Sequence, residues 1–218
     1  MTSFGLKILA IISMFLDHLS YAIYGHFSWL NYLGRLAFPI FAFQITEGYV
    51  HTKNFKKYLL RLGAFALISQ IPYLLFTNTF TDTFTLNIFF TLFAGLLAIT
   101  IFDKYTNKYL GFLYVILLAI LSELLHFDYG WFGIFVIFIF YIFKNNEINM
   151  SIAFITAVCL KYIIALIQNN FYYAYYILAL FTMLSIIPIA LYNKKQGKSA
   201  KYFFYAFYPV HLILLCLI

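Results

Sequence analysis

Four ionisable side chains interrupt long apolar stretches of the sequence. Asp17 and His18 lie in the first stretch, Arg35 in the second and His211 in the last. A charge near the centre of a membrane is costly, so such a residue is a candidate for a functional site. An imidazole beside a carboxylate is the usual arrangement of a general base, because the carboxylate orients the ring. These residues therefore suggest proton transfer at a buried site.

Asp17 and Arg35 are expected to lie at a similar depth. At about 1.5 Å per helical residue, each lies about 10 Å below the outer end of its stretch, and Lys161 about 9 Å below its own. Adjacent helical residues point about 100° apart, so Asp17 can face Arg35 while His18 faces elsewhere. Two interpretations stay open. The ion pair either stabilises the hairpin or supports catalysis by His18. Arg35 and Lys161 are also candidates for stabilising an oxyanion.

His211 is the second candidate base. It follows Pro209 by two residues inside the last apolar stretch, where a proline leaves a backbone carbonyl without its helical partner. A satisfied core histidine is the alternative interpretation.

A second polar stripe lies toward the other end of the second stretch. Gln44, Glu47 and His51 are spaced by three and four residues, so they share one helix face. Pro39 is expected to kink the helix and separate this stripe from Arg35. Four basic residues follow, and they suit either the phosphates of a nucleotide-like donor or anionic lipid. They are Lys53, Lys56, Lys57 and Arg61.

The composition indicates a membrane protein. Of the 218 residues, 65% are hydrophobic and 10% are charged, whereas soluble domains have about 45–50% apolar and about 25% charged residues. Mean hydropathy is +0.91. The chain is thus neither disordered nor an ordinary soluble globule. We predict a single integral membrane domain over residues 1–218.

Nine apolar segments predict an all-α, polytopic transmembrane bundle of about nine spans. The apolar runs are continuous and do not alternate, which disfavours a closed barrel and leaves helices to satisfy the backbone. The predicted spans are 5–24, 28–50, 58–76, 84–102, 108–125, 130–143, 150–167, 172–192 and 202–218.

Charge distribution predicts the orientation. The connections after the even-numbered spans carry lysine and arginine, and those after the odd-numbered spans carry none. By the positive-inside rule the amino terminus is cytoplasmic, in a multi-pass protein of the cell membrane that contacts lipid. The net charge of +7 is accounted for by these loops, so no nucleic-acid partner is expected. The two cysteines lack ligand-spaced partners, so no metal site is expected.

Long, ordered motifs along nearly the whole chain resemble the TraX family of integral membrane proteins. The resemblance is densest over residues 6–92. It rests on Asp17-His18, residues 33–43, Glu47-Gly48, His51-Thr52-Lys53-Asn54, residues 57–62, 68–73 and 87–92, Asp128-Tyr129-Gly130 and residues 201–211.

This resemblance implies an acetyltransferase that takes its acyl group from cytoplasmic acetyl-CoA. TraX is associated with N-acetylation of the amino terminus of a conjugative pilin, so the implied acceptor is a pilin-like peptide, or a glycan or other hydroxyl compound. His18 is then the expected base, with Asp17, Arg35 and His211 as further catalytic candidates. Glu47, His51, Lys53, Lys57 and Arg61 are the expected donor-binding residues. A proton-coupled transporter and a non-catalytic scaffold for pilus or secretion assembly are the alternatives.

Overall fold

The computed structural model describes Met1–Ile218 and is built of helices, with no β-strand beyond an isolated bridge between Leu86 and Phe127. The predicted all-α fold class is confirmed. The helices are α1 Ser3–Tyr24, α2 Leu30–Gly34, α3 Ala37–His51, α4 Phe55–Thr77, α5 Ile88–Lys104, α6 Lys108–Leu124, α7 Gly130–Ile142, α8 Glu147–Gln168, α9 Ala174–Leu184, α10 Ile186–Ala190 and α11 Lys201–Leu215.

Each of the nine predicted segments corresponds to one helix or to one broken helix. Three helices, α1, α4 and α8, are long and apolar enough to cross a membrane. Large apolar side chains lie exposed along them, including Leu60 and Ile71 on α4 and Ile148 on α8, as expected for surfaces that face lipid. The full set of nine spans and the cytoplasmic amino terminus stay predictions.

The chain forms two compact units. Unit 1 comprises Met1–Phe41 and Asn145–Ile218, and unit 2 comprises Ala42–Lys144. The boundaries therefore fall within α3 and just before α8. The single domain expected over 1–218 stays a prediction.

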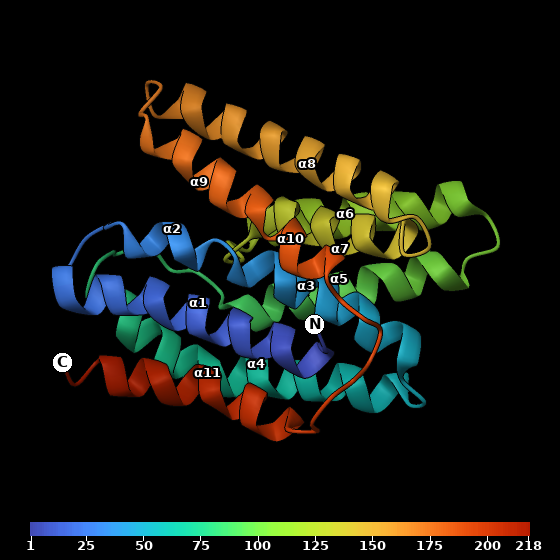
Figure 1. The fold of residues 1–218 in the computed structure, drawn as a ribbon, viewed down its shortest axis with the longest axis horizontal. Coiled ribbons are helices and arrows are strands. Elements are labelled where there is room, and N and C mark those ends of the chain that lie inside the picture. Colours follow the sequence, from blue (N-terminus) through green and yellow to red (C-terminus); the bar gives the residue numbers. More distant parts are fainter. The chain divides into compact units, whose positions relative to one another are not determined.

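Unit 1 brings the two ends of the chain together. The blue α1 and the red α11 run alongside each other (Figure 1). Phe4 contacts Phe204 near their first turns, and Phe15 contacts His211 further along, so the two helices run in the same direction. In the same unit α2 packs against α1 and α9, and α8 pairs with α9.

Unit 2 is organised around α5, which packs against α4, α6 and α7. The side chain of Asn87 caps α5 and donates to the carbonyl of Ala66 and to Gln70 on α4. Gln70 and Asn87, two polar residues of the sequence motifs described above, thus hold the start of α5 against α4. Gly95 on α5 lets Ile137 of α7 approach closely, because a Cβ there would overlap the Ile137 side chain.

Prolines interrupt two predicted spans. Pro39 lies in the first turn of α3, where it lacks the N–H that would bond to the carbonyl of Arg35. The helix is interrupted at Arg35 and Leu36, between the end of α2 and the start of α3. The predicted interruption therefore lies a few residues before Pro39 and includes Arg35. Pro188 stands in the same relation to the break at Ser185 between α9 and α10.

The close approach of α5 and α7 makes Gly95 sensitive to substitution. Gly95→Ala is expected to destabilise the protein by about 1–3 kcal/mol, the usual effect of overpacking. Thermal unfolding of the detergent-purified protein measures this. Ile137→Ala leaves a cavity and also destabilises the protein. The double variant should lose less stability than the two single losses added together. Strict additivity would contradict the contact.

Candidate active site

Two histidines of unit 1, one near each end of the chain, form a hydrogen-bonded pair. Nδ1 of His18 lies 2.7 Å from Nε2 of His211, and the two rings stack with centroids 5.0 Å apart. His211 is buried, with 2% of its surface exposed, and Tyr208 places its ring edge against His18. The two candidate bases are therefore partners in one site.

The hydrogen bonds determine which ring nitrogens carry protons. Nδ1 of His211 lies 2.8 Å from the backbone carbonyl of Phe207, and a carbonyl can only accept, so this nitrogen donates. In the neutral ring Nε2 of His211 then accepts, and Nδ1 of His18 must donate to it. Nε2 of His18 is thus the nitrogen with the unshared electron pair. The Phe207–His211–His18 chain holds His18 in the tautomer required of a base.

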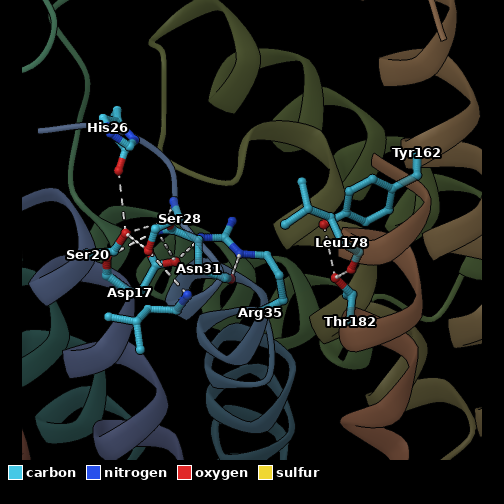
Figure 2. Close-up of polar contacts among 10 residues, drawn as sticks. Asp17, Ser20, His26, Ser28, Asn31, Arg35, Tyr162, Leu178 and Thr182 are labelled. Atoms are coloured by element: carbon cyan, nitrogen blue, oxygen red, sulfur yellow. Dashed lines mark hydrogen bonds and ion pairs between the residues drawn. The ribbon is translucent and has the colours of Figure 1, made fainter. Parts of the chain in front are cut away.

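Asp17 is held by Asn31 of α2 and by Arg35, which directly follows α2. Its Oδ1 atom accepts from Nη2 of Arg35 and, at 3.1 Å, from Nδ2 of Asn31. Nε of Arg35 donates to the carbonyl of Asn31 at 3.2 Å. Figure 2 shows Arg35 and Asn31 converging on Asp17. The predicted Asp17–Arg35 ion pair is present in the structure.

Asn31 is the centre of a polar network that sequence reasoning missed. Its side chain is fully buried, donates to Asp17, and accepts from Ser20 at 2.6 Å and from the Ser28 backbone N–H at 2.7 Å. Gly34 permits this packing, since a Cβ there would overlap the Asp17 carboxylate. The available signal was the i, i+4 spacing of Asn31 and Arg35.

Lys161 was expected in the same layer as the ion pair. Its amino group lies 5.7 Å from the ring centroid of Tyr162, and the Tyr162 hydroxyl pairs with Thr182 at 3.0 Å. Tyr162 and Thr182 belong to α8 and α9, and Figure 2 shows them across from Arg35. Tyr162 is thus an α8 residue that faces this site.

The expected donor-binding residues lie in unit 2, at the hairpin between α3 and α4. Nδ1 of His51 lies 3.0 Å from the Glu47 carbonyl and 3.8 Å from its carboxylate, as the i, i+4 spacing predicts. Lys53 and Lys57 are exposed, and the Arg61 guanidinium lies 5.7 Å from the Tyr58 ring. The structure thus gathers these basic side chains at one hairpin.

A second group that the sequence did not reveal lies at the same end of unit 2. The Asp103 carboxylate accepts from the hydroxyls of Tyr49 and Tyr141, the first at 2.8 Å. These three residues join the ends of α3, α5 and α7. Lys108 donates to the carbonyls of Phe102 and Asp103 at the end of α5.

Comparison with known proteins gives the family. A family model described as TraX protein matches residues 4–218. The chain belongs to the TraX family. It is 28% identical over 233 residues to a probable fimbrial assembly protein FimC, serogroup H1, of Dichelobacter nodosus, covering 99% of this chain and 94% of that protein. No solved structure matches.

The match to the TraX family confirms the resemblance stated from the motifs. It covers both units, from the start of α1 to the end of α11. The similarity to FimC extends over nearly the full length of both proteins. The histidine pair and the Asp17–Asn31–Arg35 network therefore lie within the matched region.

The role of Asn31 can be tested through stability. Asn31→Ala leaves buried groups of Asp17 and Ser20 with one partner fewer, which is expected to destabilise the protein by about 1–3 kcal/mol. Thermal unfolding in detergent measures the loss, with the exposed Asn145→Ala as the matched control. Equal melting temperatures for the two variants would contradict a structural network at Asn31.

Proposed function

We propose that this protein is a membrane-embedded acetyltransferase that moves an acetyl group from cytoplasmic acetyl-CoA to an extracytoplasmic or membrane-borne acceptor. The observation that carries the proposal is the Phe207–His211–His18 chain, because it leaves Nε2 of His18 as the unprotonated imidazole nitrogen. A histidine held in one tautomer by a second group is the arrangement that general-base catalysis requires.

The reaction proceeds by attack on a thioester. Nε2 of His18 removes a proton from the acceptor as its nitrogen or oxygen forms a bond to the acetyl carbonyl carbon. The tetrahedral intermediate carries a negative charge on the carbonyl oxygen. When it collapses, the carbon–sulfur bond breaks, and the CoA thiolate takes the proton back from His18. No net proton, electron or co-reactant is needed.

Arg35 is the group we assign to the oxyanion. Arg35 pairs with Asp17, which is the neighbour of His18 in the chain. Asp17 and Asn31 hold the guanidinium in one orientation, and a positive charge fixed in advance stabilises developing negative charge without reorganisation. Asp17 is then a positioning residue, which combines the two interpretations of the ion pair.

The acceptor is an amine or a hydroxyl group, and an amino terminus of a pilin-like peptide is the leading candidate. The support is the FimC name, which refers to fimbrial assembly, together with the association of TraX with pilin acetylation. A glycan hydroxyl requires the same proton transfer. A multi-pass location in the cell membrane gives such an acceptor access from outside and acetyl-CoA access from the cytoplasm.

Donor binding needs positive side chains near the predicted cytoplasmic ends of the helices, because the nucleotide end of CoA carries several phosphate charges. The α3–α4 hairpin, with Glu47, His51, Lys53, Lys57 and Arg61, is the surface that the sequence predicts. Unit 1 offers a second basic surface, at the connection between α10 and α11.

Substitution of His18 tests the proposed base. His18→Ala is expected to lower turnover with acetyl-CoA by about 100-fold or more, the usual contribution of a general base. His211→Ala should have a smaller effect, since the base remains but its tautomer is no longer held. His211→Gln should partly restore activity, because its amide oxygen can accept from Nδ1 of His18. Acetyl transfer from labelled acetyl-CoA in membranes measures all three.

The exposed His26→Ala is the matched control for loss of a histidine. Melting temperatures of the purified variants show whether each is folded. A folded His18→Ala variant that keeps more than about a tenth of the activity would exclude His18 as the base, given the usual size of that effect.

A second candidate function is a non-catalytic role in fimbrial assembly, which the name of FimC also favours. The two candidates differ in what His18 must do. If the protein is a scaffold, His18→Ala at normal abundance supports fimbrial assembly as well as the wild type, and acetyl-CoA does not stabilise the purified protein. If the protein is an acetyltransferase, the strain that carries His18→Ala accumulates unacetylated acceptor.

A further inference from the structure

A cluster of lysines lies at the end of unit 1 where α1 and α11 begin. Lys194, Lys195 and Lys198 belong to the connection between α10 and α11, Lys201 begins α11, and all four are exposed. Lys7 lies on α1. None of the five forms an ion pair, and residues 1–16 and 191–204 contain no acidic residue. We call this group the lysine loop cluster.

The connection that carries these lysines is fastened to the start of the chain. The backbone N–H groups of Ser3 and Phe4 donate to the carbonyls of Lys195 and Gln196 at 2.9 and 3.0 Å. The Asn193 N–H donates to the carbonyl of Met1 at 2.8 Å. The backbone of residues 193–196, which carries Lys194 and Lys195, is therefore held against the first turn of α1.

Two lysines of the cluster, Lys7 and Lys201, lie in the first turns of the helices that carry the histidine pair, α1 and α11. Lys7 and His18 are eleven residues apart, which places them within about 20° of one another around α1. Phe204 and His211 are seven residues apart and likewise share a face of α11. The Lys7 amino group lies 5.8 Å from the ring centroid of Phe204. One seam between α1 and α11 thus leads from the lysines to the imidazoles.

We infer that the lysine loop cluster binds the phosphate groups of the acyl-CoA donor, and that the thioester arm follows the α1–α11 seam to His18. This inference rests on the acetyltransferase function proposed above and names the donor surface for it. Phosphates recognised by several ammonium groups gain charge-assisted hydrogen bonds.

The length of the seam suits the donor. Seven to eleven helical residues separate the Lys7–Phe204 contact from the histidine pair, a rise of about 10–16 Å. The pantetheine arm, which joins the pyrophosphate of CoA to its sulfur, is about as long as four to five extended residues, roughly 13–18 Å. Phosphates among the lysines can therefore coexist with an acetyl group at His18.

The two basic surfaces differ in their surroundings. The hairpin in unit 2 carries Glu47 beside its basic residues, and the Arg61 guanidinium lies against Tyr58. The lysine loop cluster has no carboxylate in its own segments, and it belongs to the same unit as His18 and His211. Charge and connection to the base both favour unit 1 as the donor surface.

The test compares two variants that each lose four positive charges. One carries glutamine at Lys194, Lys195, Lys198 and Lys201, and the matched control carries glutamine at Lys53, Lys56, Lys57 and Arg61. Calorimetry with the full-length, detergent-purified proteins measures binding of acetyl-CoA and of adenosine 3′,5′-diphosphate. We expect binding of both to weaken at least tenfold in the first variant and less than threefold in the control.

Two further measurements separate binding from folding and from a general effect of charge. Gly197→Ala keeps every lysine but moves the loop, because Gly197 has φ +72° and a Cβ there would lie 2.8 Å from Oγ1 of Thr2. It should also weaken binding of acetyl-CoA. In Lys7→Gln the KM for acetyl-CoA should rise by a larger factor than the KM for acetylated N-acetylcysteamine, a thioester without phosphates.

The possible results separate the lysine loop assignment from the proposed acetyltransferase function. Loss of binding only in the unit 2 control overturns the lysine loop assignment and leaves the acetyltransferase proposal standing. Absence of acetyl-CoA binding by folded wild-type protein overturns both. Phosphatidylglycerol in mixed micelles tests the other source of phosphate. If that lipid stabilises the wild type through these lysines and neither nucleotide binds, the cluster is a lipid anchor and the inference is wrong.

Discussion

The ion pair between Asp17 and Arg35 is the constraint on which the site in unit 1 depends. Asp17 lies on the mainly apolar α1 and Arg35 at the break between α2 and α3, and an isolated charge among apolar helices is far more costly than a paired one. Asn31 completes the pair by donating to Asp17 and offering its carbonyl to Arg35. The hairpin of α1 and α2 is thereby held in one arrangement, and His18 keeps a fixed position beside it.

Breaks in the helices make this arrangement possible. A continuous helix through Arg35 would satisfy its carbonyl from residue 39, but Pro39 has no N–H to donate. The chain therefore ends α2 at Gly34 and begins α3 at Ala37, and Arg35 lies at the interruption. Backbone that is not helical is tolerated at membrane depth only where protein surrounds it. The charge and the interruption consequently occupy the same half-buried place.

The site divides its chemistry between two pairs. The Asp17–Arg35 pair supplies a fixed positive charge, while the His18–His211 pair supplies a nitrogen that accepts a proton. Such a division is suited to acyl transfer, in which negative charge forms on one atom while a proton leaves another. Unit 1 also carries a lysine-rich connection next to the helices that bear both histidines. Under the proposed acetyltransferase function, these parts are assigned to a base, an oxyanion partner and a donor surface.

Much of this protein was determined by its sequence alone. Apolar segment lengths and loop charges are local properties, so they predicted the helices, and the tight turn after α1 predicted the Asp17–Arg35 pair. The i, i+4 spacing likewise predicted the contact of Glu47 with His51. The tertiary structure alone decided that His18 and His211 are partners, because 193 residues separate them and helical periodicity carries no information over that distance. For the same reason it decided that Asn31, an ordinary residue in the sequence, becomes the buried centre of the polar network.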